Sequence, residues 1–560
     1  MKSRTSSCKM TAFKKDLTRF WPVWVGYLLF LILFQVTLSN NDMSYWYAAN
    51  IIESLSLMGV ANGIYALVVA QMLFGDLFNT RMCNGLHAMP MRREGWLITN
   101  LVSGFLFALI PAIVGGIVAV VALKEFYWIG LLWQATSLLQ FVFFFGIAVF
   151  SAMCAGKRLG MTAIYGILNF LSMLIFWVAD TVFEPLLPGV MLSSDWFNLF
   201  CPLVSMAGHS YINFYYDSAL GGFFKGFYFD NLHYLYICAG IGILFTVLGW
   251  LLYRKRRLET AGDFISFRPM RVFFLLAYTV AVGVLLYSFA DVLGLYRDYG
   301  FLVVGLLIGW FTGWMLLERT VKIFNKKVLL GLVAFAAVFA GSIGLTIMDP
   351  MGIVTYVPEA DEINNACMYL QKDIFYYEHE QYGLQEDRFL TEAEDIAQVR
   401  RLHQLMLQTP KETDGEVITV YVRYEKKNGM TVQRKYEIPS QSDTAEELKP
   451  FFSDPRMVFR VDDWGALKGS VRWIISYPIK SEKSIELRDP EQMAAVLDAV
   501  EADCKAGNFA QHDYFHVNRN YTGSMEIGWE HALGNSAEYV VVYDDCINTY
   551  AFLETLLENP

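Results

Sequence analysis

The chain has 560 residues, of which 55% are hydrophobic, 16% aromatic and only 18% charged, with a mean hydropathy of +0.36. Soluble domains are about 45–50% apolar and about 25% charged, so the composition argues against an ordinary soluble protein. The formal net charge of −10 argues against a nucleic-acid partner, because a nucleic-acid-binding domain would be strongly basic.

The charge is divided unevenly along the chain. Residues 1–347 carry 24 basic and 16 acidic side chains, whereas residues 348–560 carry 20 basic and 38 acidic ones. This division predicts two chemically different bodies in one polypeptide. We expect a cytoplasmic interfacial segment over 1–19, a transmembrane permease-like domain over 20–347 and an extracytoplasmic α+β domain over 348–560.

Apolar runs that are long enough to cross a bilayer recur up to about residue 347. A bilayer core about 30 Å thick needs about 20 mostly apolar residues in a helix, the form that satisfies its own backbone polar groups in lipid. Counts of eight or ten spans are the alternatives, because Asn62 interrupts the second run and the eighth run is short. The prediction is a polytopic α-helical membrane protein with about nine transmembrane helices, near residues 20–38, 57–74, 97–123, 128–153, 161–182, 234–253, 272–290, 300–317 and 328–347.

Basic residues in the short loops predict the orientation, because Lys and Arg are retained on the cytoplasmic side of a membrane. With the N-terminus inside, the predicted inner segments hold 21 basic residues, whereas the short outer loops hold Lys124, Lys225 and Arg297. An odd number of crossings then places the acidic C-terminal domain outside the cell. We therefore expect a multi-pass protein of the cell membrane.

The segment between the second and third runs, residues 74–96, is too polar for a span and too long for a bare turn. Its pattern predicts a short amphipathic helix against the membrane that ends at Gly85, with Pro90 and the pair Arg92 and Arg93 before the next span. Residues 10–20 show a similar interleaving of basic and apolar side chains. Ordinary positive-inside anchoring explains each segment alone, so a shared role is inferred only from the two together.

Polar side chains inside the predicted spans are few. A proton- or ion-driven carrier would usually keep ionisable groups at depth, but the acids of this region lie near the predicted ends of spans. Interhelical hydrogen bonding is the preferred interpretation of the interior amides, and a substrate path is the alternative. These amides are Gln71, Gln134, Gln140 and Asn169.

From Asp349 the chain is polar and shows helix and strand signals in turn. Thr391 and Glu394 have the spacing of a capping box, and an apolar stripe over 396–406 continues it as a helix. Further predicted elements are a hairpin over 416–438 that turns at Asn428-Gly429, a helix from Asp489-Pro490 to Lys505 closed by Gly507, strands over 523–529 and 538–543, and a helix over 547–557. Together they predict one α+β domain or two small ones.

Motifs of self-sufficient enzymes are missing from the sequence. There is no Gly-x-x-x-x-Gly-Lys-Ser/Thr loop for ATP phosphates, no Gly-x-Ser-x-Gly nucleophile motif and no His-Glu-x-x-His zinc motif. His512 and His516 have a spacing that suits a metal, but two solvated surface histidines are the preferred interpretation. One disulfide among Cys367, Cys504 and Cys546 is left open. We expect no catalytic residue, metal ion or cofactor in this chain.

Residues 81–93 resemble a segment of a known family, the permease subunits of ABC-2-type transporters. In that family a helical loop between spans two and three follows a pattern like Arg-x-x-Gly-x-Leu-His-x-x-Pro-x-Arg-Arg, and here it reads Arg81-Met-Cys-Asn-Gly85-Leu86-His87-Ala-Met-Pro90-Met-Arg92-Arg93. The C-terminal domain is similar to a domain of unknown function carried by some such permeases of Gram-positive bacteria, including Arg401-Leu-His403-Gln404 and Asn428-Gly429. Nine spans and a large outer domain depart from the six-span core that is usual in the family.

The resemblance implies a transporter subunit that is energised from outside the chain. A separate ATPase subunit would bind ATP and Mg, and it would dock on residues 76–94 with help from residues 9–20. Further expected partners are a second permease or a second copy of this chain, and membrane lipid. Export, or a response to envelope stress or antimicrobial peptides, is the implied task. The implied docking residues are Arg81, Gly85, His87, Pro90, Arg92 and Arg93.

Two interpretations from other classes stay open. A polytopic glycosyltransferase would need acidic residues and usually a folded loop after the first span, whereas the first outer loop here has about 18 residues with Asp42 as its one interior acid. A membrane sensor would use the outer domain for binding without transport. A neighbouring gene for a P-loop ATPase would favour the permease.

Overall fold

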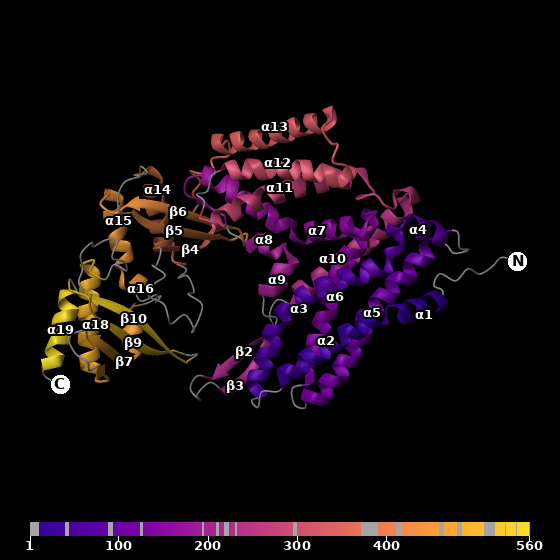
Figure 1. Ribbon diagram of the computed structural model, residues 1–560. Coiled ribbons are helices and arrows are strands. Elements are labelled where there is room, and N and C mark those ends of the chain that lie inside the picture. The colour runs from indigo at the N-terminus through magenta and orange to yellow at the C-terminus, as the bar shows by residue number, and fades with distance from the viewer. Residues whose placement is uncertain are drawn as a thin grey trace. The chain divides into compact units, whose positions relative to one another are not determined.

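The chain is shown in Figure 1 as a computed structural model, in which two compact units are distinguished. The helical unit comprises residues 1–182, 194–216 and 224–342, and the C-terminal unit comprises residues 183–193, 217–223 and 343–560. Each unit is described on its own. The structure describes residues 10–39, 44–87, 93–123, 127–192, 195–208, 212–217, 223–229, 232–294, 299–370, 390–409, 417–458, 464–478, 484–508, 521–531, 534–544 and 546–558.

The helical unit is built almost wholly from helices, with one short hairpin. Its strands are β2 (Ile212–Asp217) and β3 (Phe223–Phe229). Its main helices are α1 (Met10–Arg19), α2 (Trp21–Ser39), α3 (Ser44–Leu73), α4 (Thr80–His87), α5 (Arg93–Leu123), α6 (Tyr127–Cys154), α7 (Arg158–Val178), α8 (Asp195–Leu199), α9 (Pro202–Gly208), α10 (Leu232–Lys255), α11 (Arg268–Val292), α12 (Tyr299–Glu318) and α13 (Lys326–Met348). A short 3-10 turn, η1 (Gly75–Phe78), precedes α4, and another, η6 (Leu258–Thr260), follows α10.

Seven helices of the described residues are long and apolar enough to cross a membrane, namely α5, α6, α7, α10, α11, α12 and α13. An eighth is counted if α1 and α2, which meet at an angle of 62°, form one broken span. The described apolar part of α3, Leu57–Leu73, is shorter than a span requires. Seven of the nine predicted spans therefore correspond to helices that could cross a membrane, and these helices indicate a membrane-embedded protein. The orientation stays a prediction.

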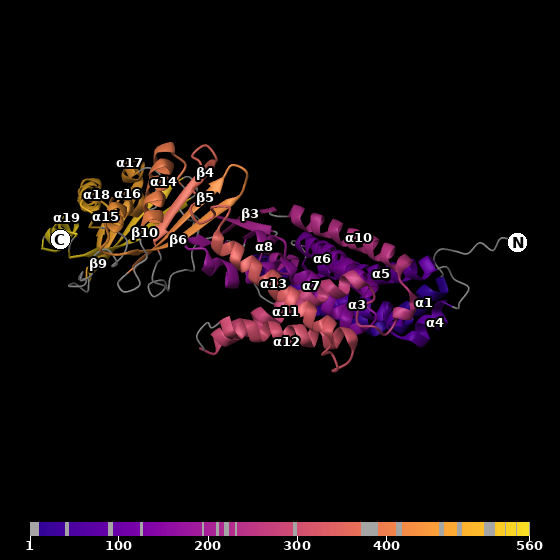
Figure 2. The same ribbon diagram turned by 90° about the horizontal axis from the view of Figure 1, so that it is seen from above.

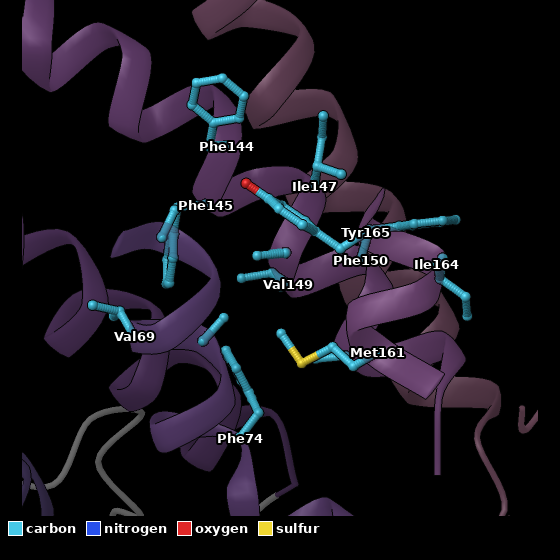
Figure 3. Packing of buried hydrophobic residues seen from close by; sticks show 14 of the residues in the cluster. Val69, Phe74, Phe144, Phe145, Ile147, Val149, Phe150, Met161, Ile164 and Tyr165 are labelled. Atoms are coloured by element: carbon cyan, nitrogen blue, oxygen red, sulfur yellow. The ribbon is translucent and has the colours of Figure 1, made fainter. Parts of the chain in front are cut away.

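Close approach of backbones characterises the packing of this unit. A Cβ atom added to Gly146 of α6 would lie 1.9 Å from the carbonyl oxygen of Gly242 in α10, so these two helices pack as closely as they do because both residues are glycine. Bulky side chains of α3, α6 and α7 pack together in the hydrophobic core of this unit, as Figure 3 shows. In both views of the chain α11 and α12 lie side by side (Figures 1 and 2).

The C-terminal unit contains two modules with a similar order of elements, which differ among the described residues in that the second has one additional strand after its first. The first module consists of β4 (Ile363–Leu370), α14 (Ala393–Gln408), β5 (Val417–Lys426), β6 (Thr431–Pro439) and α15 (Asp443–Phe452). The second consists of β7 (Val471–Pro478), β8 (Ile485–Leu487), α18 (Pro490–Lys505), β9 (Tyr521–His531), β10 (Gly534–Tyr543) and α19 (Ile547–Glu558). Two short helices, α16 (Pro455–Val458) and α17 (Trp464–Ser470), lie between them in sequence.

Each module has an antiparallel sheet and a hydrophobic core of its own. The strand order is β1-β6-β5-β4 in the first sheet and β10-β9-β7-β8 in the second, so a hairpin pairs with the first strand of the module in both. The added strand β1 (Val190–Met191) comes from the segment after α7 and pairs with Arg434 and Gln433 of β6. The sequence did not predict β1, because two residues carry no alternating pattern.

The predicted elements of the C-terminal region are confirmed, with one correction. Gly429 turns the β5–β6 hairpin in the left-handed region at φ +80°, and Gly507 follows α18 at φ +83°. Asp489 accepts a hydrogen bond from the backbone N–H of Gln492 and so caps α18. The predicted capping box of α14 is wrong: Glu392 is the residue before the helix, and its side chain makes no capping hydrogen bond.

Candidate functional site

Helix α4 lies between α3 and α5 and is not part of either. It begins where the Asn79 carboxamide oxygen accepts hydrogen bonds from the backbone N–H groups of Arg81 and Met82, at 3.0 and 3.4 Å. Among its described side chains, those of residues 80–85, only Cys83 is buried. The helix therefore presents almost its whole described surface outward, including Arg81 and the thioether of Met82, which is 44% exposed.

The predicted docking residues do not all share this surface. Arg81 and Gly85 are exposed on α4, and of His87, the last residue of the helix, only the backbone is described. The predicted end at Gly85 is wrong by two residues, because Gly85 keeps a helical backbone and the helix continues to His87. Pro90 and Arg92 lie outside the described residues.

Arg93 begins α5, and its guanidinium contacts groups of the helical unit. Its Nη2 donates to the backbone carbonyl of Arg256 at 3.2 Å, and its guanidinium carbon lies 5.3 Å from the ring centroid of Tyr253 in α10. The Tyr253 ring in turn stacks on Trp96, with the ring centroids 5.8 Å apart. Arg93 thus fastens the start of α5 to the end of α10.

Arg256, directly after α10, is the charged residue that sequence reasoning missed. It is only 3% exposed. Its Nη1 donates to the carbonyls of Ala152 and Met153 at 2.8 and 3.2 Å, and its Nη2 donates to the carbonyl of Leu77 in η1 at 3.2 Å. Burial lowers the pKa of this guanidinium to about 10, so it is still protonated at neutral pH.

The carbonyls that Arg256 binds explain how a buried cation is stabilised there. Helix α6 ends at Cys154, so Ala152 and Met153 are among the last four residues, whose carbonyls have no partner inside the helix. This end of a helix also carries the partial negative charge of the helix dipole. Arg256 therefore neutralises the end of α6 and, with its other nitrogen, holds η1 and the loop that leads to α4.

The segment that follows Arg256 closes over the turn between α6 and α7. The backbone N–H of Ser266 donates to the Cys154 carbonyl and that of Gly262 to the Gly156 carbonyl, both at 2.8 Å. A Cβ atom on Gly156 would lie 2.2 Å from the carbonyl oxygen of Thr260, so this approach requires glycine. We call residues 256–266 the clamp segment.

Deeper in the helical unit, neutral polar side chains bond between helices. Tyr27 of α2 donates to the Oδ1 of Asn62 in α3, whose Nδ2 donates to Ser137 Oγ at 3.0 Å and to Gln140 Oε1 at 2.9 Å in α6. Gln71 likewise donates from α3 to Thr162 in α7 at 2.7 Å. These contacts agree with the interhelical interpretation of Gln71 and Gln140.

Two of the predicted interior amides behave differently. Asn169 donates to the Tyr165 carbonyl of its own helix at 2.8 Å. The Gln134 amide is buried and makes no hydrogen bond within the described part of the chain.

In the C-terminal unit, His403 of α14 lies between two tyrosine hydroxyls. Its Nδ1 is 3.1 Å from the hydroxyl of Tyr424, and its Nε2 is 2.9 Å from that of Tyr436. Burial, with Arg434 as a second cause, lowers the pKa of His403 to about 3. The histidine is therefore neutral at physiological pH and joins α14 to both strands of the hairpin.

The described part of the chain shows neither a metal-binding group nor a disulfide. No group of three or more His, Cys, Asp or Glu side chains there is placed to hold a metal ion, and no disulfide joins its seven buried cysteines. His512 and His516 lie outside the described residues.

Compared with known proteins, the chain matches no family model, no curated protein and no solved structure. The resemblance to ABC-2-type permeases stays a prediction from the residues that carry it. A function for this chain must accordingly be inferred from α4 and the groups that hold it.

Proposed function

We propose that the chain is the membrane-spanning permease subunit of an ABC-2-type transporter, driven by a separate ATPase that docks on α4. The observation that carries the proposal is the exposure of α4: its described side chains all face outward except Cys83. An eight-residue helix of this kind gains little from its own propensity or packing. Its order comes from its flanks, where Arg256 holds Leu77 on one side and Arg93 begins α5 on the other.

The exposed side chains of α4 suit a protein surface. Met82 is flexible and polarizable and adapts to an apolar groove, whereas Arg81 can pair in bidentate fashion with a carboxylate. We assign these two residues to the contact with the ATPase. The sequence pattern places Arg93 among the docking residues. We assign it instead to fastening the start of α5 to the end of α10, because its guanidinium already contacts Arg256 and Tyr253. ATP and Mg would be bound by the ATPase.

The test is association between the full chain and a P-loop ATPase subunit, sought among the products of neighbouring genes and among the proteins that copurify with the chain. The double variant Arg81→Glu, Met82→Asp is expected to weaken binding of the purified ATPase about tenfold or more. It replaces a cation and an apolar side chain with two negative charges, which would repel a carboxylate on the ATPase. Lys427→Glu is the matched control, since it reverses an exposed charge in the hairpin turn of the C-terminal unit.

Three results would contradict the proposal. Unchanged binding of the double variant would remove α4 as the docking surface. Lack of any P-loop ATPase that binds the wild-type chain would remove the transporter assignment. Turnover of a compound by the chain alone, reconstituted in vesicles, would favour an enzyme such as the glycosyltransferase of the alternative interpretation.

A further inference from the structure

We propose that Arg256 is the positioning residue that transmits a displacement of α4 to α6. The inference rests on the proposed function, because it assigns the route by which a docked ATPase would move the bundle. It concerns a residue that is buried and so makes no contact with the ATPase itself.

The covalent chain gives α4 two neighbours only. A force on α4 reaches α3 through η1 and reaches α5 through the segment that ends at Arg93. Helix α6, by contrast, is the most buried of the seven candidate spans and packs against α3, α5 and α10. A motion that rearranges the bundle therefore involves α6, which is not adjacent to α4 in the chain and is reached from it by way of α3 and α5.

Arg256 supplies a direct link between η1 and the end of α6 through one planar group. One terminal nitrogen binds the last turn of α6 at Ala152 and Met153, and the other binds Leu77 just before α4. The guanidinium holds its donors in a fixed fork, so a shift of the η1 carbonyl is passed to the end of α6 without a change in the fork itself. A lysine has a single nitrogen and cannot occupy both positions.

The surroundings of Arg256 resist its displacement. Arg93 binds its backbone carbonyl at 3.2 Å, so the start of α5 moves with it. Two backbone hydrogen bonds fix the clamp segment to residues 154–156, and Arg319, after α12, donates to the Gly262 carbonyl at 2.8 Å. These bonds make the clamp segment and the end of α6 one packed body, which shifts as a unit when η1 moves.

The experiment uses the full chain in complex with its ATPase and separates binding from stimulation. Arg256→Lys keeps the positive charge at the end of α6 and is expected to fold and to bind the ATPase with a dissociation constant within about threefold of wild type. Stimulation of ATP hydrolysis at saturating ATPase is expected to fall about fivefold or more, since the coupling between the two sites is lost. Lys255→Met, which removes the exposed charge directly before Arg256 and outside the clamp segment, is expected to leave both quantities unchanged.

Full stimulation by a folded Arg256→Lys chain would overturn the inference, because a merely structural cation would be replaced by lysine. If that variant does not fold, hydrogen exchange in the wild-type complex decides the matter. Addition of a non-hydrolysable ATP analogue must alter the protection of residues 75–80 and 152–156 together, and a change confined to 75–80 would overturn the inference. Failure of the wild-type chain to bind any ATPase would instead refute the proposed function.

Discussion

The helical unit and the C-terminal unit both bury polar side chains, but of different kinds. Those of the helical unit are amides and hydroxyls such as Asn62 and Gln140, with Arg256 the one charged side chain among its buried described residues. The C-terminal unit buries the carboxylates of Asp395 and Asp503 as well as a guanidinium.

The difference follows from the surroundings of each unit. Transfer of an isolated charge out of water is very unfavourable, and a bundle of apolar helices offers no water at depth with which to offset it. The C-terminal unit holds several buried charges, each with its own partners: Asp395 accepts two hydrogen bonds from Arg456, both at 3.1 Å, whereas Arg434 donates to the backbone carbonyls of Ile353 and Tyr356. A buried charge is therefore unusual in the helical unit, and Arg256, its one example among the described residues, joins the end of a candidate span to the loop before α4.

The largest effect that tests this comparison is expected at Asp503. Its carboxylate accepts hydrogen bonds from the backbone N–H groups of Asn548 and Thr549 at 3.2 and 2.7 Å and so caps α19 from the end of α18. Asp503→Ala is expected to lower the free energy of local unfolding by about 3 kcal/mol, because a fully buried carboxylate is lost and the buried N–H of Thr549 is left without its acceptor. Hydrogen exchange of α19 peptides in the full chain measures this value.

The control for Asp503 lies on the same helix. Asp498 has a side chain that is 74% exposed and pairs with Lys468, and its replacement by Ala is expected to cost less than about 1 kcal/mol. Equal losses for the two variants would mean that burial does not set the strength of the Asp503 cap.

His403 should make the first module sensitive to acid. In the unfolded chain its pKa is about 6.5, whereas burial lowers it to about 3 in the folded module, so between these values only the unfolded state binds the proton. Stability contributed by this group is complete above about pH 6.5 and is lost as the pH falls toward 3. From pH 7 to pH 5 the loss is about 2 kcal/mol.

His403→Gln separates this effect from other titrations, because glutamine keeps a donor and an acceptor without binding a proton. Hydrogen exchange of α14 and of the β5–β6 hairpin, corrected for the pH dependence of the intrinsic rates, is measured in both chains. The wild-type chain should lose about 2 kcal/mol more than the variant over this interval. Parallel pH profiles would show that the histidine is not held neutral.

Local sequence patterns predicted most helices and strands of this molecule. They could not predict contacts between residues that are far apart in the sequence. The seven candidate spans, the hairpin at Asn428-Gly429 and the Asp489 cap of α18 all depend on patterns within one element. Arg256 could not be told from Arg254, Lys255 and Arg257, because four consecutive basic residues carry no information on which one is buried.

The cap of α19 by Asp503 was missed for a related reason. The carboxylate comes from the end of another helix, and 45 residues separate it from the N–H of Asn548. A local capping pattern cannot report such a contact, whereas the spacing at Thr391 and Glu394 met that pattern without forming the cap. Caps made by distant side chains require the fold to be known.

A smaller effect is expected at Asn62 in the helical unit. Asn62→Leu removes the partner of Tyr27, Ser137 and Gln140 while nearly conserving volume. The expected loss in detergent-micelle unfolding is about 1 kcal/mol, less than at Asp503, because polar groups of an unfolded chain in an apolar phase also find partners. Gln71→Leu, which removes one bond to Thr162, should cost about half as much. A loss at Asn62 equal to that at Asp503 would mean that neutral buried groups contribute as much stability as the buried carboxylate does.

The smallest effect concerns a single hydroxyl in α3. Pro111 of α5 has no N–H, so the carbonyl of Phe107, four residues earlier, lacks its helical donor, and the Tyr65 hydroxyl donates to that carbonyl at 2.8 Å. Tyr65→Phe keeps the ring, which stacks on Tyr27, and is expected to cost about 0.5 kcal/mol.

The same substitution in a Pro111→Ala chain should cost almost nothing, because alanine restores the helical donor to Phe107. A double-mutant cycle in detergent micelles measures this coupling directly. Coupling near zero would mean that the Tyr65 hydroxyl does not substitute for the missing backbone donor. Coupling close to the full effect of Tyr65→Phe would show that the hydroxyl replaces the backbone donor that Pro111 lacks. The helical unit would then satisfy this carbonyl with a neutral group, as it does the buried carboxamide of Asn62.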